Sequence, residues 1–161
     1  MLKKLTYLIG ISLFSYILIS CNKEENPQGK WLTGSKQEQI NKIEDHFRGF
    51  GVAMMEIGYR YQELYWAIKD ENWGYADHQL HEIEEGFELA LEKRPERAKS
   101  AHHFKTITLP EMDKLVDAKD TTNFEQVFAN MTNACNSCHA MEEMPFITVK
   151  TPLKRLSPVR N

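Results

Sequence analysis

Apolar residues recur along this chain at alternating steps of three and four, the spacing of one face of an α-helix. The longest run comprises Ile40, Ile43, Phe47, Phe50, Met54, Ile57, Tyr61, Leu64 and Ile68. We interpret it as one long helix that ends at the polar break Asp70-Glu71-Asn72. An apolar stripe of this length needs other helices to pack against, so the pattern predicts a helical fold.

Three further helices follow in the same pattern. The second runs from Trp73 to about Arg94, where Pro95 stops it, and the short break before it implies an antiparallel neighbour. A basic loop is expected up to Thr108, which begins a capping box and the third helix. A second capping box at Thr122 begins the fourth. The sequence therefore predicts an all-α, antiparallel four-helix bundle over residues 36–145.

The fourth predicted helix carries Cys135-Asn136-Ser137-Cys138-His139. Cys-x-x-Cys-His is the attachment motif of c-type haem, in which the two thiols bond to the haem and the histidine binds the iron. A zinc site is the alternative, but it needs further ligands, and the sequence has no second cysteine pair. A redox-active Cys-x-x-Cys is expected between a strand and a helix. We therefore predict one covalent haem c on Cys135 and Cys138, with His139 as an iron ligand.

The N-terminal residues have the pattern of an export signal. Lys3 and Lys4 precede an apolar run that is short for a membrane span and ends in Leu-Ile-Ser-Cys at Cys21. These last four residues resemble the lipobox of bacterial lipoproteins, in which the cysteine is lipidated. We predict a signal peptide over residues 1–20 and a lipid anchor on Cys21 that holds the chain outside the cytoplasm, at the periplasmic face or cell surface. A retained anchor helix is the alternative.

Composition limits the domains and partners of the remaining chain. About 140 residues follow the signal, enough for one domain, with a linker over 21–35 and an irregular tail over 146–161. The formal net charge is -3, and the loss of Lys3 and Lys4 makes it -5, with 18 basic against 23 acidic residues. This balance argues against a nucleic acid as partner.

Four helices with Cys-x-x-Cys-His near the end of the last one resemble the class II c-type cytochromes, the family of cytochrome c′ and its low-spin relatives. The resemblance covers roughly residues 36–142, and Cys135, Cys138 and His139 carry it. It implies a four-helix bundle around one covalent haem, and a homodimer through the first helix is open. The C-terminal tail is longer than is usual in the family and could fold back over the haem edge.

A second iron ligand has to come from upstream of the motif. In an antiparallel bundle, the end of the first helix lies level with the start of the fourth, which places Met54 at the level of Cys138. Met54 is our candidate sixth ligand, and low-spin members of the family similarly use a methionine of the first helix. Met55 and His46 are the less favoured alternatives, and a plain core role for Met54 is the other interpretation.

These features predict an electron carrier rather than an enzyme, because no catalytic constellation accompanies the motif. The carrier would pass single electrons between redox partner proteins, with the membrane reached through the lipid. A five-coordinate haem that binds nitric oxide or another small gas, as in cytochrome c′, is the main alternative. An accessory subunit of a larger redox enzyme is a third.

Overall fold

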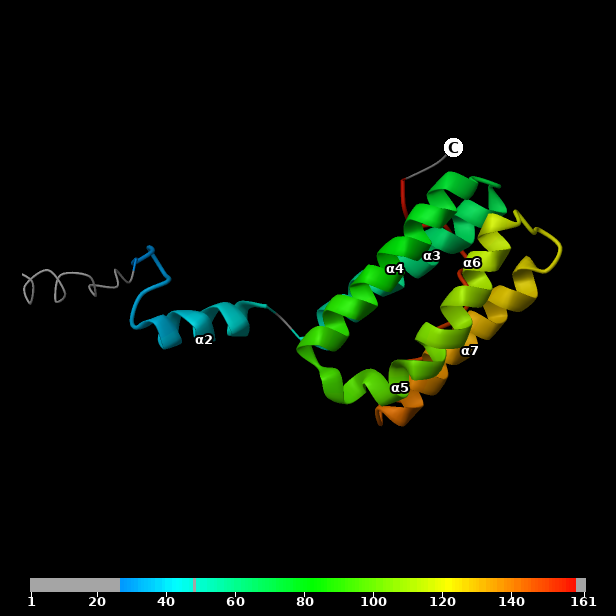
Figure 1. Ribbon diagram of the computed structural model, residues 1–161. Coiled ribbons are helices and arrows are strands. Elements are labelled where there is room, and N and C mark those ends of the chain that lie inside the picture. The colour runs from blue at the N-terminus through cyan, green and yellow to red at the C-terminus, as the bar shows by residue number, and fades with distance from the viewer. Residues whose placement is uncertain (1–26, 48, 159–161) are drawn as a thin grey trace, which may run out of the picture. The chain divides into compact units, whose positions relative to one another are not determined.

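The computed structural model describes residues 27–47 and 49–158 (Figure 1). The predicted signal peptide and Cys21 lie outside the described residues. The chain divides into two units, residues 1–47 and residues 48–161. No helix in the described ranges is both long enough and apolar enough to cross a membrane.

The first unit contains one helix, α2 (Lys36–His46). Its start is a capping box: the Ser35 hydroxyl accepts the backbone N–H of Glu38, and the Glu38 carboxylate accepts the N–H of Ser35 at 2.6 Å. No residue of α2 is buried. Near its end, the rings of Trp31 and His46 lie 4.7 Å apart.

The prediction of one long helix from Ile40 to Ile68 is wrong, because α2 ends at His46 and α3 begins at Phe50. The N–H of Phe47 closes the last turn of α2 on the Ile43 carbonyl. Gly49 then takes an extended conformation as the N-cap of α3, and glycine is a poor helix former. The apolar spacing continues across this break, so the spacing alone could not reveal that the helix is interrupted.

The second unit is helical, with no strand among its described residues, as predicted. Its long helices are α3 (Phe50–Lys69), α4 (Trp73–Lys93) and α7 (Phe124–Met141). The third arm is composite, and it comprises η1 (Pro95–Arg97), α5 (Ala98–His103), the π-helical turn η2 (Phe104–Thr108) and α6 (Leu109–Asp117). The arrangement of these helices is compatible with a helical bundle (Figure 1).

The core joins these arms in a ring. Helix α4 packs against α3 on one side and α6 on the other, and α6 packs against α7. Large aromatic side chains close the ring between α3 and α7, because Tyr61 and Tyr65 contact Phe128 with ring centroids 4.7 and 4.9 Å apart. At the end of α3, Lys69 forms an ion pair of 2.9 Å with Glu125 at the start of α7. The predicted antiparallel register of these two helices is thereby confirmed.

The predicted basic loop before Thr108 is wrong, because residues 95–117 are almost continuously helical. Ala101 and Phe104 are each 1% exposed and hold this segment on the core. The π-helical turn that begins at Phe104 keeps Thr108, Leu109 and later apolar residues on the buried face. Thr108 therefore lies buried within the helical arm and makes no side-chain cap.

The predicted capping box at Thr122 is also wrong. The Asp120 carboxylate accepts the backbone N–H groups of Thr122 at 2.8 Å and Asn123 at 3.1 Å. It also accepts the side-chain amide of Asn123. These hydrogen bonds, Asn123 first, lower the pKa of Asp120. Asp120 thus fixes the turn that leads into α7.

Three helices end in the same way, with a non-glycine residue in the left-handed region: Glu71, Lys119 and Glu143. After each, a backbone N–H returns to the carbonyl five residues earlier, and the last of these bonds joins Met144 to His139 at 2.8 Å. This is the Schellman closure of a helix. After α7 it turns the chain sharply, so that the C-terminal segment, red in Figure 1, runs back along the bundle.

Candidate functional site

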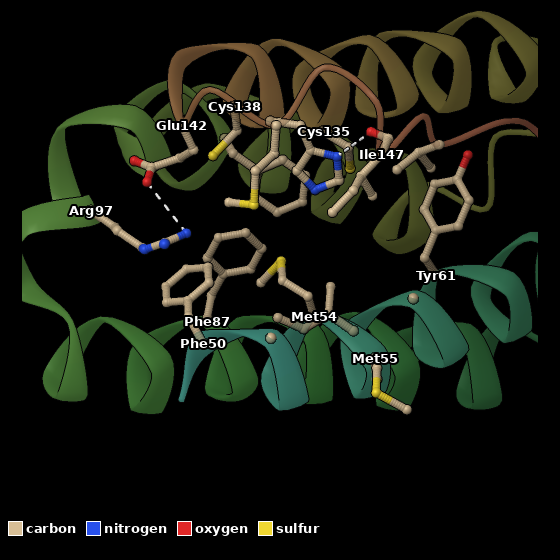
Figure 2. A pocket seen from close by; sticks show the side chains of 17 residues that line it. Phe50, Met54, Met55, Tyr61, Phe87, Arg97, Cys135, Cys138, Glu142 and Ile147 are labelled. Atoms are coloured by element: carbon tan, nitrogen blue, oxygen red, sulfur yellow. Dashed lines mark hydrogen bonds and ion pairs between the residues drawn. The ribbon is translucent and has the colours of Figure 1, made fainter. Parts of the chain in front are cut away.

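An apolar cavity of about 330 Å³ opens at the end of α7 (Figure 2). We call it the motif cavity. It is lined by Phe50, Gly51, Met54, Met55, Ile57, Gly58, Tyr61, Phe87, Arg97, Phe104, Cys135, Cys138, His139, Glu142, Met144, Ile147 and Val149. Its size is at the lower end of the range for small-molecule and cofactor sites. All three residues of the predicted haem motif are among its lining.

Helix α7 contributes the motif itself. Cys135, Cys138 and His139 stand three and four residues apart, so the helix presents all three on one face. Both cysteines are free thiols. Burial raises the pKa of Cys135 to about 12, and it raises that of Cys138 as well. Both are therefore neutral near pH 7, whereas a redox-active dithiol needs a stabilised thiolate.

His139 has a fixed orientation. Its Nδ1 atom lies 2.8 Å from the backbone carbonyl oxygen of Ile147, the bond drawn as a dashed line to Ile147 in Figure 2. Because a carbonyl oxygen can only accept, Nδ1 carries the proton and the lone pair of the neutral ring is on Nε2. Histidines that ligate metals are commonly held in this way through the other ring nitrogen. The geometry therefore leaves Nε2 free to bind a metal.

Helix α3 forms the wall that faces α7. Met54 is partly buried and points into the cavity, while Met55 is 77% exposed and points away (Figure 2). Gly51 and Gly58 lie on the same helix, and a β-carbon added to either would meet no atom within 4 Å. Of the two methionines predicted as candidate ligands, the structure places only Met54 with its side chain toward the motif.

Aromatic rings and one ion pair complete the lining. Phe87 contacts Phe50 at a centroid distance of 6.3 Å and stacks on Phe104 at 4.8 Å, which gives a wall without hydrogen-bonding groups. At the edge, Arg97 lies 4.9 Å from the Phe50 ring centroid and forms an ion pair of 3.3 Å with Glu142. Arg97 is the one permanently cationic side chain among the described residues of the lining.

His46, the third candidate ligand, belongs to the first unit and its ring contacts Trp31. Its assignment as an iron ligand stays a prediction. The sequence analysis did not assign Phe104, Glu142, Ile147 or Val149 to the site. The helical spacing of Ala101 and Phe104 could have shown that the third arm reaches the core, but no pattern in the irregular tail indicated Ile147 or Val149.

The lining does not resemble a conventional metal site. Over residues 27–47 and 49–158, no three His, Cys, Asp or Glu side chains gather where they could hold a metal ion. A tetrahedral zinc site would need such a group. No family model, no curated protein and no solved structure matches this chain.

Proposed function

We propose that this protein is a lipid-anchored, extracytoplasmic monohaem c-type cytochrome that carries single electrons between redox partner proteins. One observation carries the proposal: Cys135, Cys138 and His139 line one apolar cavity, and His139 is oriented through Nδ1 so that Nε2 is free. The export pattern that ends at Cys21 supports the compartment, since c-type haem and lipidation both belong outside the cytoplasm. The resemblance to class II c-type cytochromes supports the same function.

The residues of the motif cavity fit the group that the motif implies. The lining is almost entirely apolar, as a porphyrin face requires, and the two thiols reach it from one side. Gly51 and Gly58 leave open space along α3 where a flat ring could approach the helix backbone. Arg97 at the edge offers a cation to the negatively charged propionates.

Each side chain has a separate task in this proposal. Haem, when bound, supplies one-electron chemistry at its iron. Cys135 and Cys138 hold the group covalently, and His139 binds from α7 through Nε2. Met54 offers a thioether from α3, and such a ligand favours a higher reduction potential. The aromatic wall of Phe50, Phe87 and Phe104 keeps water away from the site.

A five-coordinate haem that binds nitric oxide or another small gas is the second candidate. The observation that favours it is the same aromatic wall, which offers no hydrogen-bond donor opposite the motif. In that case Met54 lines the pocket without binding the iron. The two functions therefore differ in the coordination of the iron, which a spectrum reports directly.

The test is to produce the chain without its lipid cysteine in a host that attaches c-type haem, and to record oxidised and reduced spectra. Met54→Ala is compared with Met55→Ala, which removes the same side chain from a neighbouring position that points away from the cavity. We expect a low-spin spectrum whose methionine-to-iron charge-transfer band disappears completely in Met54→Ala and persists in Met55→Ala.

Two other results would change the conclusion. A wild-type chain that carries no covalent haem overturns the cytochrome proposal. A high-spin spectrum that neither substitution changes, together with reversible nitric oxide binding by the reduced protein, favours the gas-binding function. Loss of the band in Met55→Ala alone would assign the ligand to Met55.

A further inference from the structure

A side chain between the two cysteines of the motif holds the C-terminal segment, in addition to His139. Asn136, the residue after Cys135, pairs with the backbone of Val149 in both directions. Its Oδ1 accepts the Val149 N–H at 2.7 Å, and its Nδ2 donates to the Val149 carbonyl at 3.0 Å. The amide thus makes the pair of bonds that a neighbouring strand would make.

This contact lies two residues beyond Ile147, whose carbonyl accepts the Nδ1 proton of His139. At its other end, the short loop 142–147 is held by the helix closure from Met144 N–H to the His139 carbonyl. Ile147 is 46% exposed, so its own burial fixes it only weakly. The position of the Ile147 carbonyl is therefore determined by hydrogen bonds on both sides of it. The Met144 bond holds the chain before it, and the two Asn136–Val149 bonds hold the chain after it.

The rest of the segment is anchored more distantly. Arg155 forms an ion pair with Asp70 and lies 5.0 Å from the Trp66 ring centroid, near the end of α3. Ser157 is 5% exposed. These contacts hold the far end of the segment at the opposite end of the bundle from the motif, and Asn136 holds the near end.

We propose that Asn136 is a positioning residue: by docking Val149 it keeps the Ile147 carbonyl on Nδ1 of His139 and so sets the strength of the histidine as an iron ligand. The role at the iron rests on the proposed function, while the docking does not. A hydrogen bond from Nδ1 makes the imidazole a better electron donor, which favours ferric over ferrous iron. Loss of the docking therefore weakens the iron–histidine bond and raises the midpoint potential.

The docking is tested on the full chain without haem by amide hydrogen exchange. In Asn136→Ala, exchange of the Val149 N–H is expected to become at least about tenfold faster, as the loss of hydrogen bonds of ordinary strength implies. Asn130→Ala is the matched control, because Asn130 lies on the same helix and its side chain pairs with Gln126 instead. It should leave Val149 protected. Equal protection of Val149 in wild type and Asn136→Ala overturns the proposal.

The role at the iron is tested on the haem-loaded chain. Asn136→Ala should raise the midpoint potential, which a spectroscopic redox titration measures. Asn130→Ala should leave the midpoint potential unchanged. An unchanged midpoint potential in Asn136→Ala overturns the positioning role.

The two arms separate this inference from the proposed function. If the wild-type chain takes up no covalent haem, the cytochrome proposal and the role at the iron both fail. Hydrogen exchange at Val149 still decides whether Asn136 docks the segment. If haem is attached and the Asn136→Ala variant behaves as the wild type does, the inference fails while the cytochrome proposal stands.

Discussion

Tyr61 shows how one buried hydroxyl joins three parts of the second unit. Its Oη lies 2.6 Å from Oγ1 of Thr132 on α7. The Thr132 hydroxyl already donates its only proton to the Phe128 carbonyl at 2.9 Å, so Tyr61 is the donor in this pair. The carbonyl of Lys150, in the C-terminal segment, lies 3.5 Å from the same Oη. Burial raises the pKa of Tyr61 from 10.0 to about 12.

We expect Tyr61→Phe to lower the free energy of unfolding of the haem-free chain by about 1 kcal/mol near neutral pH, the usual net value of one hydrogen bond. The loss is modest because Thr132 keeps its bond to Phe128. Urea denaturation measures it. A variant that equals or exceeds the wild type in stability would contradict the bond.

The same substitution has a defined pH dependence. The raised pKa means that folding favours the neutral phenol, so its stabilisation is fully present below pH 10 and is lost as pH rises to about 12. The variant lacks this titration. The stability difference between wild type and Tyr61→Phe should therefore shrink over that window, while the similarly raised Tyr75 acts in both proteins and cancels. A constant difference would contradict the assignment.

At the scale of single residues, the sequence predicted the residues that a motif or the helix register identifies. Cys135, Cys138 and His139 were found by spacing, and the antiparallel register placed Met54 beside them. The sequence favoured Met54 but could not exclude Met55, because adjacent helical positions differ by about 100° and the orientation of the apolar face was known only roughly. It also could not find Asn136 or Ile147, since their roles depend on where the tail folds.

At the scale of elements, the start of α7 shows why a helix start was predicted wrongly from the sequence. A threonine with a glutamate three residues later predicted a cap at Thr122, but the observed acceptor is Asp120, two and three residues before the N–H groups that it binds. The Asp side chain competes with a helical cap by forming a turn with the following backbone. The sequence contained both the capping-box pattern at Thr122 and the turn pattern at Asp120, and the structure has the turn.

We expect Asp120→Ala to lower the melting temperature near neutral pH, and Thr122→Ala to leave it nearly unchanged. The pKa of Asp120 is lowered by its hydrogen bonds to Asn123 and Thr122, so its stabilisation is present above the ordinary carboxyl value of 3.8 and is lost as pH falls through the lowered one. Thermal unfolding followed by circular dichroism at both ends of this range is the measurement. A larger loss in Thr122→Ala would restore the predicted capping box.

The helix boundaries of α4 agree with the sequence prediction, whereas those of the first and third arms do not. Pro95 and the break after Asp70 are strong signals for α4. In the first arm, Phe47 and Phe50 continue the apolar spacing across a gap that only Gly49 marks. In the third arm, the π-helical turn that begins at Phe104 adds residues to the turn. The apolar residues after it no longer follow the 3.6-residue spacing of an α-helix, so the spacing did not predict a helix there.

At the scale of the whole molecule, the chain divides into two units, and the buried core of the described residues lies in the second. No residue of α2 is buried, while the second unit contains every residue of the hydrophobic core. The sequence predicted one domain over residues 36–145, because a helix that continues through Phe47 would have joined the two. The stability of the bundle should therefore be independent of α2.

A chain that begins at residue 48 should unfold with the same midpoint and free energy as the full chain, within the ~0.5 kcal/mol expected of surface changes.

A chain that ends at Glu143 should, by contrast, be clearly less stable than the full chain, because it loses the Val149 and Arg155 contacts and the buried Ser157. The N-terminal truncation also removes His46. If His46 were the sixth ligand, the haem-loaded truncated chain would lose its low-spin spectrum, whereas Met54 as ligand predicts that the spectrum is retained.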